Sequence, residues 1–316
     1  RALTNQLEQD STEPAWGNFV QPLEDMEERI ARAWAQVSHM NAVVNNPELR
    51  EAYNTNLAKL TSYYAEMAQN NALYARLKQL RARPDFEQLS PARKKIVDNE
   101  LRDFRLGGAE LPDKQKARFK AIQEELSQHS ARFEENLLDT TNDFAHFVTD
   151  AAELAGIPQD AALAAREAAE ADGKPGWKFT LHFPSYMPVM QYADNRMLRE
   201  KIYFAYATRA SEFGKPEWDN SGLIKEILKL RREAAQLLGY ANYGEVSLAT
   251  KMAQSPAQVL DFLGSLAARA KPFAERDMAE LRAFAQDQLD LNTLEAWDIA
   301  YASEKLREAK FAFSDQ

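Results

Sequence analysis

Residues 112–144 of the chain read PDKQKARFKAIQEELSQHSARFEENLLDTTNDF. Large apolar side chains recur in this stretch every three, four or seven residues, at Phe119, Ile122, Leu126, Phe133, Leu137 and Phe144. This spacing is typical of one face of an α-helix. A continuous helix of this length would measure about 50 Å, at ~1.5 Å per residue. Because such a helix needs neighbours along its apolar face, the stretch predicts long helices packed antiparallel.

The same spacing recurs on both sides of this stretch. Asn46-Pro47 and Ser90-Pro91 are each typical of a helix start, with an N-cap followed by proline at the first helical position. Gly107-Gly108 is typical of a helix end. The first two helices carry the apolar stripes Leu23, Met26, Ile30, Trp34, Val37, Val44 and Leu49, Tyr53, Leu57, Leu60, Tyr64, Met67. Further helices are expected over 196–209, over 220–239 and from Ser255-Pro256 onward, the last bent or ended at Pro272.

One segment departs from the helical pattern. Residues 147–150 form a short β-like run, and residues 177–183 alternate apolar and polar side chains between Gly176 and Pro184. These two runs are expected to pair as a small sheet around an alanine-rich helix over 160–171. The fold class is therefore mainly α, with a helical region over 1–146, a small sheet insertion over 147–184 and a helical region over 185–316. No linker divides these regions into independent domains.

Composition excludes several kinds of protein. The 316 residues include 39 Lys and Arg against 48 Asp and Glu, a net charge of −9, and contain no Cys. Disulfide frameworks, thiolate zinc sites and cysteine nucleophiles are thereby excluded, and nucleic acid is a poor partner for an acidic chain. The sequence contains neither a signal peptide nor a membrane-spanning run, so a cytoplasmic protein without membrane contact is expected. Both ends are expected to lie inside a longer product.

The common catalytic motifs are missing from the sequence. There is no G-x-G-x-x-G or Walker loop, no G-x-S-x-G, and no H-E-x-x-H among the four histidines His39, His129, His146 and His182. Asp143, His146 and Asp150 have spacing that would suit a metal site, but a polar edge between a helix and a strand is the favoured interpretation. We therefore assign no catalytic or metal residue to this chain.

Two further groups favour structural roles over functional ones. Glu125 and His129 are interpreted as a solvated helix pair, and the adjacent glutamates at 27–28, 124–125 and 134–135 as solvated faces. Aromatic side chains gather at Tyr186, Tyr192, Tyr203, Phe204 and Tyr206. They are typical of core packing, with the lining of a peptide channel as the alternative. Substrate-binding residues stay unassigned.

Several blocks resemble the thimet-oligopeptidase family of zinc metallopeptidases, most closely its oligopeptidase A group. They are NAVV (41–44), NPELREAY (46–53), FVTD (147–150), ELAGIP (153–158), PSYMPVM (184–190), LRE (198–200), YATRAS (206–211), WDNS (218–221), LLGY (237–240), SLATKMA (247–253), WDIAY (297–301) and SEKL (303–306). The blocks are spread over the whole chain. One departure is Ala302, where the family usually has tyrosine, which suggests a lost contact near the channel.

The resemblance implies a two-lobed, mostly helical channel peptidase of zincin type that hydrolyses short peptides, including degraded signal peptides. Family members bind Zn²⁺ through H-E-x-x-H and a downstream glutamate, and no position here matches that motif. By resemblance this chain is the N-terminal, channel-forming portion, inactive alone and without zinc of its own. Its expected partners are short peptides and the C-terminal catalytic region, and it is expected to be monomeric. The alternatives are a dipeptidyl carboxypeptidase of the same family and a free-standing helical binding or scaffold protein.

Overall fold

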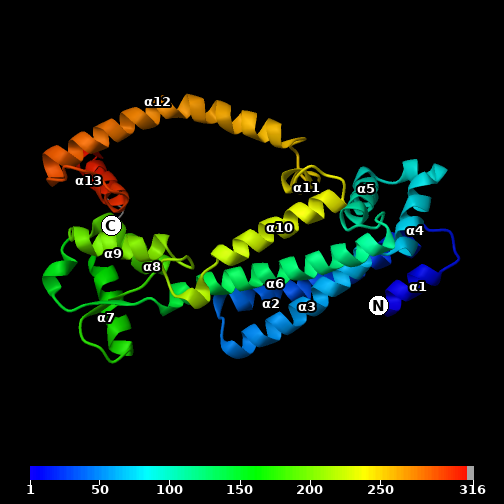
Figure 1. Ribbon diagram of the computed structural model, residues 1–316, viewed down its shortest axis with the longest axis horizontal. Coiled ribbons are helices and arrows are strands. Elements are labelled where there is room, and N and C mark those ends of the chain that lie inside the picture. Colours follow the sequence, from blue (N-terminus) through cyan, green and yellow to red (C-terminus); the bar gives the residue numbers. More distant parts are fainter. Residues whose placement is uncertain (312–316) are drawn as a thin grey trace. The chain divides into compact units, whose positions relative to one another are not determined.

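The computed structural model describes residues 1–311, which form thirteen α-helices, five short 3₁₀ or π segments and one two-stranded sheet (Figure 1). The first six helices are α1 (Ala2–Gln9), α2 (Gln21–Val43), α3 (Pro47–Ala68), α4 (Asn71–Ala82), α5 (Pro91–Leu106) and α6 (Asp113–Asp143). The others are α7 (Gln159–Ala171), α8 (Phe183–Tyr192), α9 (Arg196–Ala207), α10 (Ser221–Leu237), α11 (Tyr243–Leu248), α12 (Pro256–Leu289) and α13 (Ile299–Phe311). The strands are β1 (His146–Val148) and β2 (Trp177–Phe179). The predicted fold class, mainly helical with one small sheet, is confirmed.

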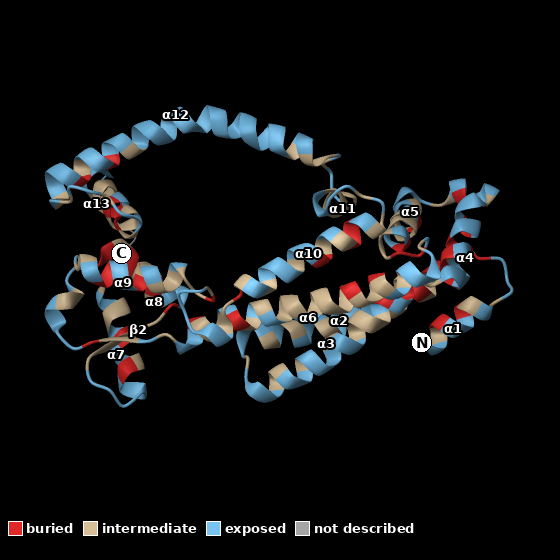
Figure 2. Ribbon diagram, viewed as in Figure 1, coloured by how far each residue is buried: buried red, intermediate tan, exposed pale blue. Residues whose placement is uncertain are grey.

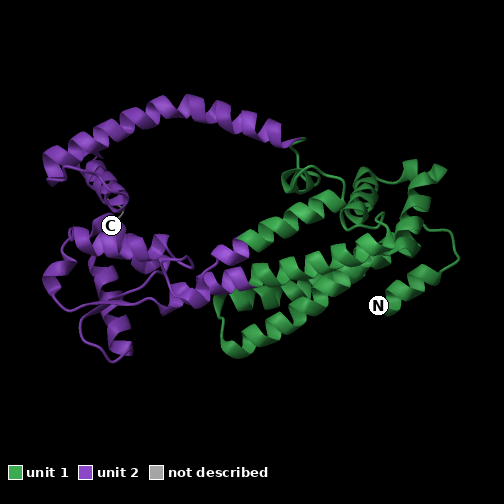
Figure 3. Ribbon diagram, viewed as in Figure 1, with its two compact units in different colours: residues 1–131, 225–254 green, residues 132–224, 255–316 purple. Residues whose placement is uncertain are grey.

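The chain divides into two compact units whose segments alternate along the sequence (Figure 3). Unit 1 comprises Arg1–Ala131 and Lys225–Gln254, and unit 2 comprises Arg132–Ile224 and Ser255–Gln316. The long helix predicted over 112–144 is continuous as α6, and its first residues belong to unit 1.

Unit 1 is built from helices whose starts follow the predicted caps. Asn46 caps α3, accepting the Leu49 N–H at 2.8 Å, and Ser90 caps α5. Because residues 44–46 join α2 directly to α3, these two helices run antiparallel and pack on each other. The main core of unit 1 is centred on Phe19, Leu73, Leu77, Phe86 and Val97.

Unit 2 contains the sheet. β1 and β2 are antiparallel, with His146 opposite Phe179 and Val148 opposite Trp177, and α7 packs on β2. Gly176 adopts φ +89° beside the Val148 carbonyl, where a Cβ would lie 2.1 Å from that oxygen. Glycine is therefore required where the chain turns into β2. The core of unit 2 joins this sheet to α8 and α9.

The second predicted strand is shorter than expected. β2 ends at Phe179, and His182 is the N-cap of α8 rather than a strand residue. Phe183, expected on the inner face of a strand, is 66% exposed at the start of α8. Pro184 occupies one of the first two positions of α8, where proline favours a helix start, and the Thr180 N–H donates to the Ser185 Oγ at 2.9 Å.

Two prolines lie inside helices. α8 runs through Pro188 and precedes the helix predicted over 196–209, and α12 runs through Pro272 without ending there. Each proline leaves one carbonyl four residues earlier without its helical partner. These carbonyls belong to Pro184 and Ala268, both exposed, so water can replace the missing donor. α12 curves along its whole length in Figure 1 and continues past Pro272 to Leu289, so the expected end at this proline is absent.

Ala302 is fully buried where α13 packs on the C-terminal part of α12, beside Leu281 and Ala285. The expectation of a lost contact near a channel stays a prediction. A small side chain allows the two helices to approach closely at this point, and a tyrosine would need the space that Leu281 and Ala285 occupy.

Candidate functional site

A cavity of about 610 Å³ in unit 2 is the strongest candidate site, because it combines apolar and charged walls. Its volume is in the range of small-molecule and peptide side-chain pockets. α9 supplies most of the wall, and β1, the turn after it and the segment before α13 supply the rest. The lining residues are His146, Glu153, Asn195, Met197, Leu198, Glu200, Lys201, Phe204 and Trp297.

Asn195 links two parts of this wall. Its Oδ1 accepts the N–H groups of Met197 and Leu198, at 3.1 and 3.2 Å, and so caps α9. Its Nδ2 donates to the Glu153 carboxylate at 3.2 Å. The start of α9 is thereby held against the turn that follows β1.

The ionisable side chains in the wall influence one another. Burial and the charge of Lys201 lower the pKa of His146, and Glu153 opposes that effect. His146 is therefore held as a neutral imidazole near neutral pH. Lys201 forms no ion pair among residues 1–311, so its ammonium group is available to an anion, such as a peptide carboxylate.

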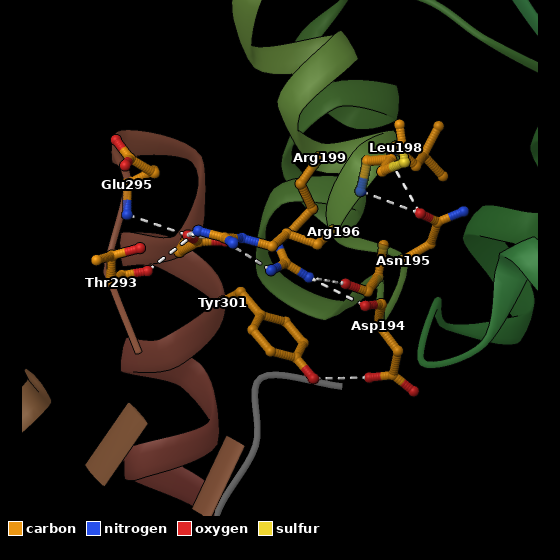
Figure 4. A network of polar contacts seen from close by, with 11 residues as sticks. Asp194, Asn195, Arg196, Leu198, Arg199, Thr293, Glu295 and Tyr301 are labelled. Atoms are coloured by element: carbon orange, nitrogen blue, oxygen red, sulfur yellow. Dashed lines mark hydrogen bonds and ion pairs between the residues drawn. The ribbon is translucent and has the colours of Figure 1, made fainter. Parts of the chain in front are cut away.

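A buried ion cluster is formed by residues next to Met197, Leu198 and Trp297 of the cavity wall, and its polar contacts are drawn in Figure 4. The Asp298 side chain is fully buried and accepts the Arg196 Nη2 at 2.7 Å and the Arg199 Nη2 at 2.8 Å. It also accepts the backbone N–H of Glu295 at 3.0 Å. Burial raises the pKa of Asp298, but the hydrogen bonds from Arg196 and Arg199 outweigh it, and the net pKa is lowered.

The same cluster extends to α13. Arg199 is 1% exposed, donates to the Ala193 carbonyl at 2.6 Å and lies 4.0 Å from the centre of the Tyr301 ring. The Tyr301 hydroxyl donates to Asp194 at 2.9 Å (Figure 4). Burial and the Asp194 carboxylate raise the pKa of Tyr301 to about 12, so it stays protonated. These contacts fix α9, the turn before it and α13 together, and with them Trp297 in the cavity wall.

The three residues considered as a metal site lie in separate interactions. Asp143 pairs with Lys215 at 2.8 Å, His146 faces the cavity, and Asp150 accepts the Ala152 N–H at 2.9 Å. Within residues 1–311, no three His, Asp or Glu side chains are placed to hold one metal ion. The favoured interpretation, a polar edge, is the one this placement supports. The residues described here do not fit a zinc ion.

The aromatic group is mostly core, as favoured. Tyr186 stacks on Tyr206 with ring centres 4.1 Å apart, and Tyr192 is 5% exposed. Tyr203 packs near Trp297, while Phe204 is 55% exposed and faces the cavity. Only Phe204 therefore supports the alternative of a ligand-facing aromatic.

Three of the solvated carboxylate interpretations need correction. Glu125 pairs with Arg118 at 2.9 Å rather than with His129, and the same arginine also reaches Glu233 on α10. Glu27 is partly buried, and burial followed by the charge of Glu24 raises its pKa. The Glu135 side chain is also largely buried, at 13% exposure, whereas Glu28 and Glu134 are exposed, as expected.

Sequence reasoning missed the buried ion cluster. Asp298 stands inside an otherwise apolar run, between Trp297 and Ile299, whereas Arg199 lies in a charged stretch with Glu200 and Lys201. A charge inside an apolar run is the available signal, because a buried charge needs an opposite partner. The pairing itself joins residues about a hundred positions apart and is visible only in the structure.

Comparison with known proteins places two segments of the chain in families. Residues 1–116 match the model of the neurolysin/thimet oligopeptidase N-terminal domain, and residues 189–316 match that of peptidase family M3. Residues 189–316 belong to peptidase family M3, and residues 1–116 to the neurolysin/thimet oligopeptidase N-terminal domain. The resemblance drawn from the sequence blocks is thereby confirmed.

The relatives of this chain are oligopeptidases. It is 46% identical over 304 residues to oligopeptidase A of Salmonella typhimurium and 47% identical over 303 residues to that of Escherichia coli. These alignments cover 96% and 95% of this chain and 45% of each relative. Dipeptidyl carboxypeptidase of Escherichia coli is more distant, at 28% identity over 94% of this chain and 44% of that protein. The chain thus spans just under half the length of the curated relatives that it matches.

A separate finding concerns membranes. None of the helices within residues 1–311 combines the length and the apolar character that crossing a bilayer requires.

Proposed function

We propose that this chain is the N-terminal portion of an oligopeptidase A-like zinc metallopeptidase that hydrolyses short peptides, including degraded signal peptides. The observation that carries the proposal is the identity of 46–47% to two oligopeptidases A along nearly all of this chain. The lower identity to dipeptidyl carboxypeptidase, 28%, makes that activity the second candidate. In this proposal the chain forms one wall of the substrate channel.

The proposed division of labour puts the chemistry outside this chain. M3 chemistry needs a zinc ion, and no group of residues within 1–311 is arranged to bind one. The cavity beside α9 is instead suited to binding, since Lys201 can meet a carboxylate and Glu153 and Glu200 can meet an ammonium group. We infer that it contacts peptide rather than cleaves it.

We further propose that the partner of this chain is the catalytic region of the same protein. Support comes from α12, which is exposed over most of its length and carries Leu260, Phe262, Leu263, Leu266 and Phe273 at 48–68% exposure (Figure 2). Apolar groups gathered on one exposed helix are typical of an interaction surface. The assembled protein is expected to be a cytoplasmic monomer that binds neither nucleic acid nor membranes, consistent with the net charge of −9 and the absence of Cys.

The test is to assay the purified 316-residue chain on an internally quenched fluorescent peptide, with and without a zinc chelator. Oligopeptidase A of Escherichia coli serves as the positive control. The proposal expects no chelator-sensitive hydrolysis and less than one tenth of a zinc ion per chain by elemental analysis. Hydrolysis that the chelator abolishes, or about one bound zinc per chain, would show that the catalytic machinery is here after all.

A further inference from the structure

A second hollow lies in unit 1, along the surface between α2 and α3, and has a volume of about 710 Å³. Most of its lining side chains are apolar. The lining residues are Met26, Arg29, Ile30, Ala33, Trp34, Val37, Asn56, Lys59 and Leu60. We call this hollow the α2–α3 groove.

The groove exists because the apolar stripe of α2 is only partly covered. Leu23 at the start of the stripe is 2% exposed, whereas Val37 is 36% exposed. Trp34 stacks on Tyr53 of α3, with ring centres 4.9 Å apart and planes 16° from parallel. This stack joins the two helices. Beside it, the apolar side chains that line the groove stay accessible to a ligand.

Two cations stand at this apolar surface without acidic partners. Neither Arg29 nor Lys59 forms an ion pair within residues 1–311, and the Lys59 Nζ reaches only the Asn56 Oδ1, at 3.4 Å. On the same helix Arg32 forms an ion pair with Glu28, one turn earlier. An acidic partner is therefore present on α2, yet Arg29 forms no such pair. An apolar floor beside two unpaired cations is complementary to an apolar ligand that ends in a carboxylate.

We propose that the α2–α3 groove binds apolar peptides through their free C-terminal carboxylate, which Arg29 and Lys59 receive while the side chains lie on Ile30, Trp34 and Leu60. The choice of a peptide over other apolar anions rests on the proposed function, because proteolysis of apolar sequences produces such ends. The groove would hold peptides for the enzyme without cleaving them.

The test measures binding to the full 316-residue chain by fluorescence anisotropy. The probe is a fluorescein-labelled tetrapeptide of leucine and phenylalanine, used with a free C-terminal carboxylate and as the C-terminal amide. We expect the amide to bind at least tenfold more weakly than the acid. The double variant Arg29→Gln/Lys59→Gln should bind the acid at least tenfold more weakly than the unaltered chain does. Its affinity for the amide should change by no more than twofold. Both side chains are exposed, so the variant is expected to fold, which circular dichroism can check.

The matched control is Arg32→Gln, which removes a cation from α2 outside the groove and should change neither affinity by more than twofold. The proposal is overturned if the acid does not bind, or if acid and amide bind alike, or if the double variant has no effect.

The proposal is also overturned if the groove binds one of two other occupants instead. Laurate that displaces the peptide and binds more tightly would identify a lipid site, and a dimer in sedimentation that the peptide cannot dissociate would identify a second copy. Because binding is measured without hydrolysis, failure here is distinguishable from failure of the proposed activity.

Discussion

Glu100 on α5 carries a charge that the folded protein disfavours. Burial, followed by the charges of Glu27, Glu24 and Asp103, raises its pKa from 4.5 to about 7. A carboxyl group with a raised pKa binds its proton more tightly in the folded state than in the unfolded state. Stability is therefore lost as the pH rises from about 4.5 through 7, and the loss is complete above 7.

The variant Glu100→Gln is accordingly expected to stabilise the protein at pH 8 and to have little effect at pH 5. The gain at pH 8 should be about 1–3 kcal/mol, since one pKa unit corresponds to ~1.4 kcal/mol. Urea unfolding at the two pH values measures it. The control is Glu134→Gln, at an exposed position of α6, which should leave the free energy of unfolding unchanged at both pH values. An equal gain for Glu100→Gln at pH 5 and pH 8 would contradict the assigned burial.

Asp298 shows the opposite behaviour, because its pKa is lowered in the folded state. Its contribution to stability is present above its ordinary value of 3.8 and is lost as the pH falls through the lower folded value. Asp298→Asn would leave Arg199, itself 1% exposed, without its counter-charge, at a cost of about 3–5 kcal/mol.

The control for this variant is Asp143→Asn, which breaks an exposed pair with Lys215. That substitution should cost less than about 1 kcal/mol. The two variants are compared with the unaltered chain by chemical unfolding at pH 7 and at pH 3. The penalty of Asp298→Asn should shrink at the lower pH, and a constant penalty would count against the ion cluster as its source.

At the residue scale, sequence alone predicted single roles but not partners. The caps Asn46 and Ser90 were predictable because a cap is set by residues within one turn. Arg199 and Asp298 were not, because nothing local specifies which opposite charge a buried ion will meet. The pKa of Glu100 likewise depends on residues of another helix, α2.

At the scale of elements, helix positions followed from apolar spacing, and errors occurred where a local rule competed with another. The alternation through residue 183 predicted strand, but β2 ends at Phe179 and α8 begins at Phe183, with Pro184 at a position that favours a helix start. The apolar stripe of α2 was predictable from the sequence. That α3 covers only part of this stripe, and so leaves the α2–α3 groove, depends on how α3 is placed and was not predictable.

α12 offers a test of how its internal proline is tolerated. Pro272→Ala restores a backbone donor to the exposed carbonyl of Ala268 and removes a residue that disfavours helix interiors by up to ~3 kcal/mol. We expect a higher melting temperature for the variant by thermal unfolding. Pro256→Ala is the matched control, since Pro256 occupies the first helical position, where proline is favourable. A gain of equal size in the control would show that the effect is not helix-specific.

At the scale of the whole molecule, the family was predictable from the sequence blocks, since they are long and occur in order. The alternation of two units along the chain was not, because it depends on which distant segments pack together. The prediction of three consecutive regions, over 1–146, 147–184 and 185–316, stays a prediction about sequence organisation.

We propose that these residues serve as the channel-forming portion of a peptidase whose chemistry lies elsewhere. This proposal is tested most directly by a chimera in which this chain replaces the matching segment of oligopeptidase A from Escherichia coli, 47% identical to it. Hydrolysis of a quenched peptide is measured for the chimera, for this chain alone and for oligopeptidase A lacking the segment. The account predicts chelator-sensitive activity in the chimera, within about tenfold of the intact relative, and none in either piece alone. A folded but inactive chimera, or turnover by this chain alone, would contradict it.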